Sequence, residues 1–391
     1  MWEYFPELKD ILGDFITNFF WWLIAAPSVV LLLWFANKIK FWWNNRTKVH
    51  YFLGREKETS RLVMKIKTGQ SGVIIGIFGQ ERTEMLTCLR DCKFYGREID
   101  NLIFSHVDIS SLEKNFEPKQ FWEKILEPLR EKIFRTNCNA LKKTFSECQA
   151  KHFSNDCLDK LFEEVNQANL RLVLFLDRFH EILHKPNLKQ KVFLANLRSL
   201  STSVHPSPLC LVITVHESLS KLHERFIEEM GYSTSPFFNF MDVGEITLGA
   251  LPELDRDKVL KKLKLSKKAQ SFIKDEVGRH PYLLRIATNR LKEAYKLGEK
   301  NPVEVTKQDF NKLCAQLLRD MQSTWHSKMC QIFVQIAQGT FSNPANDYVK
   351  ELEELEKQGL IKQENAQWQV LSPVFVKLLK ERDVSTLCTK K

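Results

Sequence analysis

The hydrophobic residues of the chain fall into one long run near the start and several short runs after residue 70. The long run covers residues 15–36 and holds no charged side chain in 22 positions. A helix of that length spans about 30 Å, the thickness of the hydrocarbon core of a bilayer. A cleaved signal peptide has instead a basic start and a small-residue cleavage site. The pattern therefore predicts one transmembrane helix.

The charges that flank this run predict its orientation. Residues 1–14 are acidic, and the positions after the run are basic, with Lys38, Lys40, Arg46 and Lys48. Because positive residues gather on the cytosolic side of a membrane, residues 1–14 are predicted to form a short non-cytosolic N-terminus. The expected localisation is a single-pass membrane protein with its N-terminus outside and its C-terminal bulk in the cytosol.

Five short runs in the next part of the chain have the length of β-strands and are apolar nearly throughout. Strands that are buried on both faces of a sheet have this pattern. Helical patterns lie between the runs, and this alternation predicts a doubly wound parallel sheet over residues 48–250. The runs are Val73–Phe78, Asn101–Val107, Arg171–Leu176, Leu209–Val215 and Glu245–Leu248.

The strand pattern stops after residue 250. Residues 251–318 have helical patterns alone and are predicted to form a helical lid domain. Residues 319–385 show two helices and a short hairpin around Asn365, which is the order of elements in a winged-helix domain. The predicted fold class is thus α/β, with a doubly wound parallel sheet, an α-helical lid and a winged helix after one transmembrane helix.

Composition and net charge exclude fewer classes of protein than the pattern of hydrophobic residues does. Of the 391 residues, 43% are hydrophobic and 27% are charged, which is typical of globular proteins. The net charge of +10 suits an anionic membrane surface or a nucleic acid. The nine cysteines form no CxxC pair, which predicts reduced thiols and no zinc site. A lysine run with helical spacing is usually a solvated face, with lipid or nucleic acid as alternatives; it comprises Lys258, Lys261, Lys262, Lys264, Lys267 and Lys268.

The first apolar run leads into a partial match to the phosphate-binding P-loop, GxxxxGK[ST] between a strand and a helix. Gly76 and Gly79 are in place, and Thr83 stands where the hydroxyl that binds magnesium belongs. The second template glycine is Glu81, and the lysine is Arg82. A glutamate puts negative charge and a side chain where backbone must approach phosphate closely.

Two later runs end in residues that would complete such a site. Asp177 ends the third run and would hold magnesium, with a strand-ending helix cap as the alternative. The next residue, which is usually the catalytic glutamate, is Arg178, and Glu181 is a weak candidate to replace it. Thr214 and His216 end the fourth run and are candidates to sense a terminal phosphate, although a structural histidine explains His216 equally well.

These motifs in this order resemble STAND-type signalling NTPases and their AAA+ relatives. Tyr51–Glu58 (YFLGREKE) is similar to the FxGRexE segment that precedes the P-loop, and Gly278–Leu284 (GRHPYLL) to the GxHPYLL helix. Leu352–Ile361 and Trp368–Phe375 are similar to the winged helix that closes these proteins. The resemblance covers roughly residues 50–380, and it implies that the first segment and Pro281 line an adenine pocket.

The resemblance implies ATP or ADP with Mg²⁺ as candidate cofactors, and Thr83 and Asp177 as metal ligands. The chain departs from the family at Glu81, Arg82, Arg178 and His216. Each lost transition-state contact typically costs about 10²–10³ in rate, so efficient hydrolysis is not expected. The residues expected to bind nucleotide are Gly54, Arg55, Gly76, Gly79, Gln80, Glu81, Arg82, Thr83, Thr214, His216 and Pro281.

The resulting hypothesis is a membrane-anchored regulatory, signalling or assembly scaffold with a degenerate ATPase site. Its expected partners are the membrane and a protein, which could be an intact ATPase paralogue or a second copy of the chain. One alternative is a slow, active ATPase that uses Arg82 and Glu181 as replacements. Another is a membrane-tethered DNA-binding protein that uses the winged helix, and the excess of glutamate in residues 351–361 disfavours it.

Overall fold

The computed structural model describes residues 54–91, 94–135, 138–202, 205–231, 244–263, 265–342 and 347–380. The chain from Leu53 onward forms one compact unit. The predicted transmembrane segment 15–36 and the N-terminus 1–14 lie outside the described residues. Among the residues that are described, no helix is both long and apolar enough to cross a membrane.

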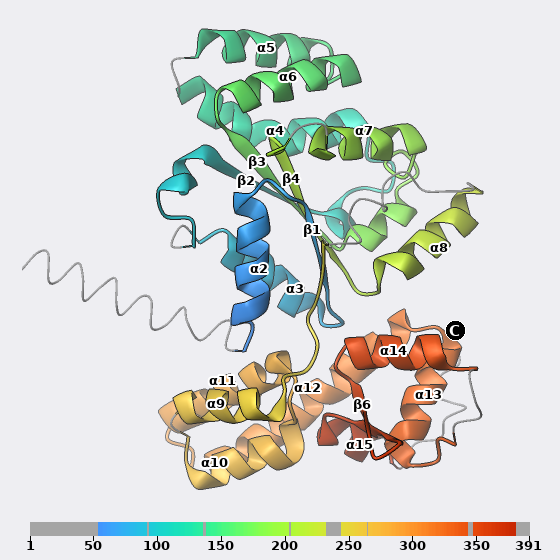
Figure 1. Cartoon of the computed structure of the whole chain (residues 1–391). Coiled ribbons are helices and arrows are strands. Elements are labelled where there is room, and N and C mark those ends of the chain that lie inside the picture. The colour runs from blue at the N-terminus through green and yellow to red at the C-terminus, as the bar shows by residue number, and fades with distance from the viewer. Residues whose placement is uncertain are drawn as a thin grey trace, which may run out of the picture. The chain divides into compact units, whose positions relative to one another are not determined.

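A parallel sheet of five strands forms the core of the first part of the unit, as the alternating pattern predicts (Figure 1). The strand order is β2-β3-β4-β1-β5, so β4 lies between the P-loop strand β1 and the strand β3 that carries Asp177. Every residue of β1 and β4 is buried, which explains their continuous apolar sequences. The strands are β1 Gly72–Ile75, β2 Leu102–Asp108, β3 Arg171–Asp177, β4 Leu209–Val215 and β5 Glu245–Thr247.

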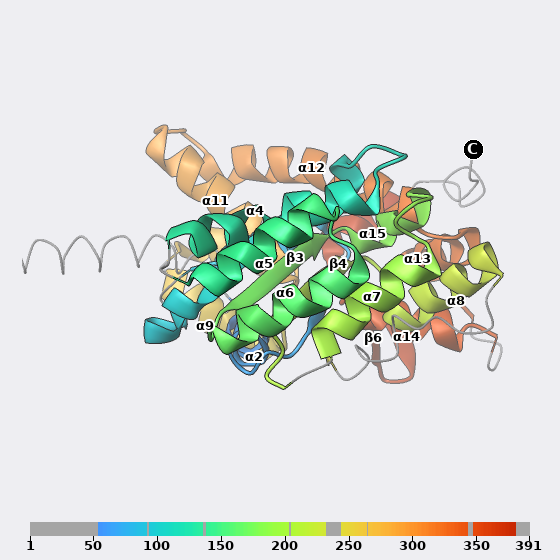
Figure 2. The same cartoon turned by 90° about the horizontal axis from the view of Figure 1, so that it is seen from above.

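Helices cover both faces of this sheet (Figures 1 and 2). The connection from β1 to β2 runs in the opposite direction across the sheet from the three later connections. Because parallel crossovers are right-handed, α3 lies on one face and α4, α7 and α8 on the other. The helices are α2 Glu56–Lys67, α3 Gly79–Leu89, α4 Pro118–Arg135, α5 Asn139–Ala150, α6 Asn155–Gln167, α7 Lys191–Thr202 and α8 Leu219–Met230, with short 3₁₀ turns η4 Gly96–Asn101, η5 Ile109–Ser111 and η6 Phe179–His184.

The strand boundary that matters most differs from the prediction. The run Val73–Phe78 is not a strand throughout, because β1 ends at Ile75 and α3 begins at Gly79. Only three residues, Gly76–Phe78, join the strand to the helix. A Cβ on Gly76 would lie 3.2 Å from the side chain of Leu248, so a larger residue there would require Leu248 to shift by a few tenths of an ångström. The P-loop template needs a longer connection than this.

Residues 251–318, for which the sequence predicts helices alone, contain helices and no strand among the residues that the structure describes, and their last helix continues beyond the predicted boundary to Thr324. A second hydrophobic core fills this part together with the C-terminal elements. Its elements are α9 Glu253–Leu263, α10 Lys267–Phe272, a π-helical turn η9 Ile273–Val277, α11 Pro281–Lys296 and α12 Pro302–Thr324. The C-terminal elements are α13 Ser327–Gln338, α14 Val349–Lys357, the antiparallel hairpin β6 Ile361–Glu364 and β7 Gln367–Val370, and α15 Pro373–Leu379. The hairpin turns at Asn365, where the sequence places it.

The thiols depart from the expectation that all cysteines are reduced. Six described cysteines are free, namely Cys88, Cys138, Cys148, Cys157, Cys210 and Cys314. Cys330 is disulfide-bonded.

Close backbone contact between α14 and the segment after β5 gives a stability prediction. Gly359 has φ +70°, and a Cβ there would lie 2.0 Å from the Ala250 nitrogen. Gly298 also has φ +70°, but a Cβ there would meet nothing within 4 Å. Gly298→Ala should therefore cost about 1 kcal/mol for backbone strain alone, and Gly359→Ala about 3 kcal/mol or more. Urea unfolding of both variants measures this difference, and equal costs would contradict the close packing.

Candidate functional site

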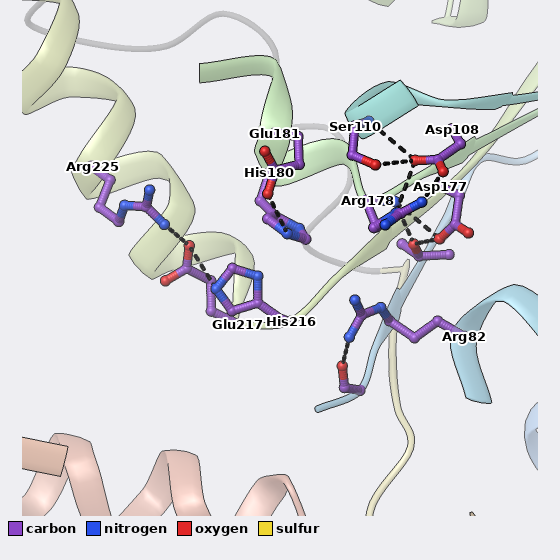
Figure 3. Close-up of polar contacts among 12 residues, drawn as sticks. Arg82, Asp108, Ser110, Asp177, Arg178, His180, Glu181, His216, Glu217 and Arg225 are labelled. Carbon is purple, nitrogen blue, oxygen red and sulfur yellow. Dashed lines mark hydrogen bonds and ion pairs between the residues drawn. The ribbon is translucent and has the colours of Figure 1, made fainter. Parts of the chain in front are cut away.

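The candidate site lies at the carboxyl ends of β1, β3 and β4, where ligands bind in open parallel sheets. The structure brings Thr83 and Asp177 into contact, since the Thr83 hydroxyl donates to Asp177 Oδ2 over 2.5 Å. Thr214, which is fully buried, donates to the other oxygen, Oδ1. Three residues that the sequence assigned to one site from distant segments thus lie together. Figure 3 shows Asp177 with the neighbouring Arg178 and Asp108.

Arg178 occupies the position of the catalytic glutamate and makes only structural contacts. Its backbone is left-handed, with φ 52°, and its N–H donates to Asp177 Oδ1 over 2.9 Å. Its guanidinium pairs with both oxygens of Asp108, at 2.9 Å from Nε to Oδ1. Asp108 ends β2 in direct register with Asp177. Asp108 was not among the residues predicted from the sequence, although its position at the end of a strand was a usable signal.

Glu181, the candidate replacement base, lies in η6 beside His180. The two side chains are 3.5 Å apart, and Figure 3 shows Glu181 oriented toward this histidine rather than toward Asp177. The ring of His180 packs edge-on against that of His216, with centroids 4.0 Å apart. Burial lowers the pKa of His216 to about 3, and burial followed by the proximity of His216 lowers the pKa of His180. Both imidazoles are therefore neutral at neutral pH.

The loop after β1 does not form the predicted anion cradle. The N–H groups of Glu81 and Arg82 both donate to the Phe78 carbonyl, over 3.1 and 3.3 Å. Neither Gly76 nor Gly79 adopts the left-handed conformation, which alternates with right-handed residues in a backbone nest that binds anions. Helix α3 thus begins early, at Gly79. The Glu81 and Arg82 amides, which a P-loop would offer to phosphate, bind a carbonyl group of the protein itself.

Arg82 turns its charge toward its own loop. Its side chain is only 4% exposed, and Nη1 donates to the Gly76 carbonyl. Burial lowers the pKa of this guanidinium to about 10, while nearby Asp177 acts against the shift, so the side chain remains a cation at neutral pH. Its Nε, also buried, has no hydrogen-bond partner. The positive charge of the template lysine is retained, but it faces backbone.

Glu81 forms a buried ion pair in place of the template glycine. Its Oε1 accepts hydrogen bonds from Arg55 Nε and Nη2, over 3.0 and 2.9 Å. Its Oε2 lies 4.0 Å from Nδ1 of His280, which is 1% exposed. Burial raises the pKa of Glu81, and Arg55 opposes that shift. The segment before the P-loop and the GRHPYLL motif therefore meet at the residue that departs most from the template.

Aromatic and polar contacts join the same loop to α11 of the lid. The Phe78 ring stacks on Tyr282 and meets His280 edge-on, each with centroids 4.7 Å apart. The Tyr282 hydroxyl donates to Gln80 over 2.9 Å, and Glu84 of α3 pairs with Arg285 of α11. None of these aromatic contacts was predicted from the sequence.

Gly54 and Pro281, the remaining residues predicted to bind nucleotide, determine the local backbone conformation. Gly54 has φ +92°, and a Cβ there would lie 2.8 Å from Leu251, so it allows the tight turn that places Arg55. Pro281 is the first residue of α11, where its missing N–H costs nothing. The neighbouring side chains of Phe78, His280 and Arg55 are all buried.

The residues fit a magnesium ion in kind but do not fit a nucleotide in arrangement. Thr83 and Asp177 supply the hard oxygen ligands that Mg²⁺ prefers. Asp177 Oδ1, however, already accepts from Thr214 and Arg178. The amides of Glu81 and Arg82 and the guanidinium of Arg82 bind carbonyl groups of the loop itself.

Comparison with known proteins bears on the fold. No protein-family profile and no curated protein sequence matches the chain. A solved structure, the Walker-type ATPase PABY2304 of Pyrococcus abyssi, matches with a TM-score of 0.55 at 14% identity, covering 84% of this chain and 96% of that chain. This chain has the fold of a P-loop ATPase. At such identity the likeness concerns the fold alone, and function has to be argued from the site.

Two other solved structures are less similar. The ORC2 protein of Aeropyrum pernix in its ADP form has a TM-score of 0.42 at 13% identity, covering 86% of this chain and 94% of that chain. The ORC1 protein of the same organism, solved with DNA, has 0.41 at 12% identity, covering 85% and 91%. Both TM-scores are below 0.5, so we infer nothing about this protein from these two structures.

The buried histidine beside the site gives a pH prediction. His216 has an ordinary pKa of 6.5 when unfolded and about 3 when folded, so the unfolded chain binds more protons below pH 6.5. Stability is therefore lost as the pH falls from 6.5 toward 3, by about 2 kcal/mol at pH 5 from this one group. Chemical unfolding at pH 7 and pH 5 should show that His216→Gln loses about 2 kcal/mol less than the wild type. Parallel losses in the two proteins would contradict the assignment.

Proposed function

We propose that the protein is a membrane-anchored, hydrolysis-deficient P-loop protein of the STAND/AAA+ type that acts as a regulatory or assembly scaffold. The observation that carries the proposal is the closure of the loop after β1, where Glu81 and Arg82 donate their amides to Phe78. A working P-loop keeps such amides free for phosphate oxygens. Here the polypeptide itself satisfies them, so the fold can hold its shape without ATP or ADP.

The catalytic side of the site supports the same proposal. Hydrolysis requires a base or a positioned carboxylate for the attacking water. Arg178 stands in that position and is bound to Asp108, while Glu181 lies against His180. The alternative of a slow ATPase requires both residues to leave these partners, and no contact of the described residues favours that rearrangement.

A fixed lid is what a scaffold requires. In nucleotide-driven switches the lid and the P-loop domain move relative to each other as the ligand changes. In this protein Phe78 belongs to the hydrophobic core of the lid, and the Arg55–Glu81 pair is buried beneath it. Opening the lid would expose Phe78 to water and separate the charged residues from the groups packed around them. We infer that a protein partner binds a surface whose shape stays the same because the lid does not move.

The C-terminal part supports a packing role for the proposed winged helix rather than DNA binding. Helix α14 directs Glu354, which is 4% exposed, toward Lys221 of α8, 3.9 Å away. Just after α14, the Gln358 amide donates to the His216 carbonyl over 3.4 Å. The acidic helix is thus engaged by the P-loop domain, and its glutamates would repel phosphates. The C-terminal elements therefore pack against the carboxyl end of the sheet, where the candidate site lies.

The membrane part of the proposal rests on the sequence. Residues 15–36 supply an uncharged span with acidic residues before it and basic residues after it. We propose that this segment fixes the P-loop fold to the cytosolic face of a bilayer. An intact ATPase paralogue or a second copy of the chain is the kind of protein partner that a degenerate P-loop subunit would assist.

Steady-state ATP turnover tests the lack of hydrolysis. The full chain in detergent should release phosphate no faster than its Asp177→Asn variant, because no group activates the attacking water. A double variant that restores the template, Glu81→Gly with Arg82→Lys, should remain equally slow, since Arg178 still occupies the position of the catalytic glutamate. Wild-type turnover that Asp177→Asn abolishes would reject the proposal and favour the slow ATPase.

A further inference from the structure

Two exposed hydrophobic residues lie among lysines at the C-terminal end of α11. Leu297 is 72% exposed and Tyr295 is 47% exposed. Isolated exposed apolar side chains are common on protein surfaces, but this pair sits within three positions of the chain. We call the tip patch the set Lys267, Lys268, Lys292, Tyr295, Lys296, Leu297 and Lys300.

A side-chain contact brings the two ends of this set together. The hydroxyls of Ser266 and Tyr295 lie 3.1 Å apart, which joins the start of α10 to the end of α11. Lys267 and Lys268 directly follow Ser266 and are exposed. Residues from two helices therefore share one tip, in the part of the lid labelled α10 and α11 in Figure 1.

Positive charge at this tip is only partly compensated. Lys292 and Lys296 are four positions apart on α11 and so lie on the same face of the helix. Burial, followed by the charge of Lys296, lowers the pKa of Lys292. The nearby Glu293 forms an ion pair with Arg290, with 3.2 Å between Oε2 and Nη1. Glu299 is the remaining acidic residue of this segment. Five lysines with two exposed apolar side chains thus form a surface that is positive and apolar at once.

We propose that the tip patch docks on an anionic lipid surface, with Leu297 and Tyr295 at the level of the headgroups and the lysines around them bound to lipid phosphates. Amphipathic surfaces that insert at the bilayer interface combine these residue types. Each lysine near an anionic leaflet adds an attraction that salt screens. A nucleic acid would also attract the lysines, but it would leave Leu297 exposed to water.

The proposal rests on the membrane tether that the proposed function includes. If residues 15–36 span the bilayer, only seventeen residues, 37–53, separate the membrane from the described part of the chain. Even a fully extended segment of that length reaches no more than about 60 Å. The tip patch is then held at a high effective concentration beside the lipid, so a weak contact suffices. Docking would fix which face of the scaffold points toward the cytosol.

Photo-crosslinking of the full chain in lipid nanodiscs tests this contact. Benzoylphenylalanine replaces Leu297 in one protein and Val192 in the other, because Val192 is equally exposed, at 68%, but lies on α7. With phosphatidylserine in the disc, position 297 should form about fivefold more lipid adduct than in phosphatidylcholine alone, the effect expected of about one lysine contact. Position 192 should form little adduct in either lipid.

Charge removal provides the matched control. The triple change Lys267→Gln, Lys268→Gln and Lys296→Gln should lower the adduct at position 297 in phosphatidylserine discs to the level of phosphatidylcholine discs. The triple change Lys124→Gln, Lys143→Gln and Lys151→Gln removes the same charge from the α4–α5 region and should leave the adduct unchanged. Equal loss in both triples would mean that net charge, and not the tip patch, attracts the lipid, and would overturn the proposal.

The remaining outcomes separate this proposal from the tether beneath it. A chain that fails to enter the discs overturns the tether and this proposal with it. A chain that enters the discs but gives equal adduct at positions 297 and 192 overturns this proposal alone. Retention of duplex DNA that the tip-patch triple abolishes, without a lipid adduct at position 297, would assign the lysines to nucleic acid instead.

Discussion

The buried ion pair between Arg55 and Glu81 is the constraint on which the arrangement of the site depends. Two charges that are removed from water need each other, because separating a buried pair leaves an uncompensated charge and costs several kcal/mol. Arg55 comes from the segment before the P-loop and Glu81 from the first turn of α3, with His280 of the lid packed over them. The segment before β1, the first turn of α3 and the start of α11 are therefore bound to one another.

The rest of the site adapts to this closure. With Glu81 turned toward Arg55, α3 begins at Gly79, and its first amides find the Phe78 carbonyl. Arg82 then reaches the Gly76 carbonyl instead of a ligand. Around Asp177 a second network, made with Thr83, Thr214 and the backbone of Arg178, joins the ends of β3 and β4 to α3 through hydrogen bonds. These polar residues thus act here as structural links, which suits a protein that presents a constant surface.

The sequence was sufficient to predict the sheet and the meeting of Thr83, Thr214 and Asp177, because buried parallel strands have continuous apolar runs and their carboxyl ends share one edge. It could not predict that β1 ends at Ile75. That boundary follows from the partners of Glu81, which lie 26 and 199 positions away at Arg55 and His280. Tertiary contacts of this kind override a local motif. The same limit applies to the Arg178–Asp108 pair, which depends on strand order and not on spacing along the chain.

The nucleotide content of the full chain, measured after purification and denaturation, tests the self-closed site most directly. The account predicts substantially less than one adenine nucleotide per chain, in the wild type and in Asp177→Asn alike, because the polypeptide already uses the groups that would hold phosphate. The Glu81→Gly, Arg82→Lys double variant should gain bound nucleotide, since it frees the first turn of α3. A stoichiometric nucleotide in the wild-type protein would contradict the account.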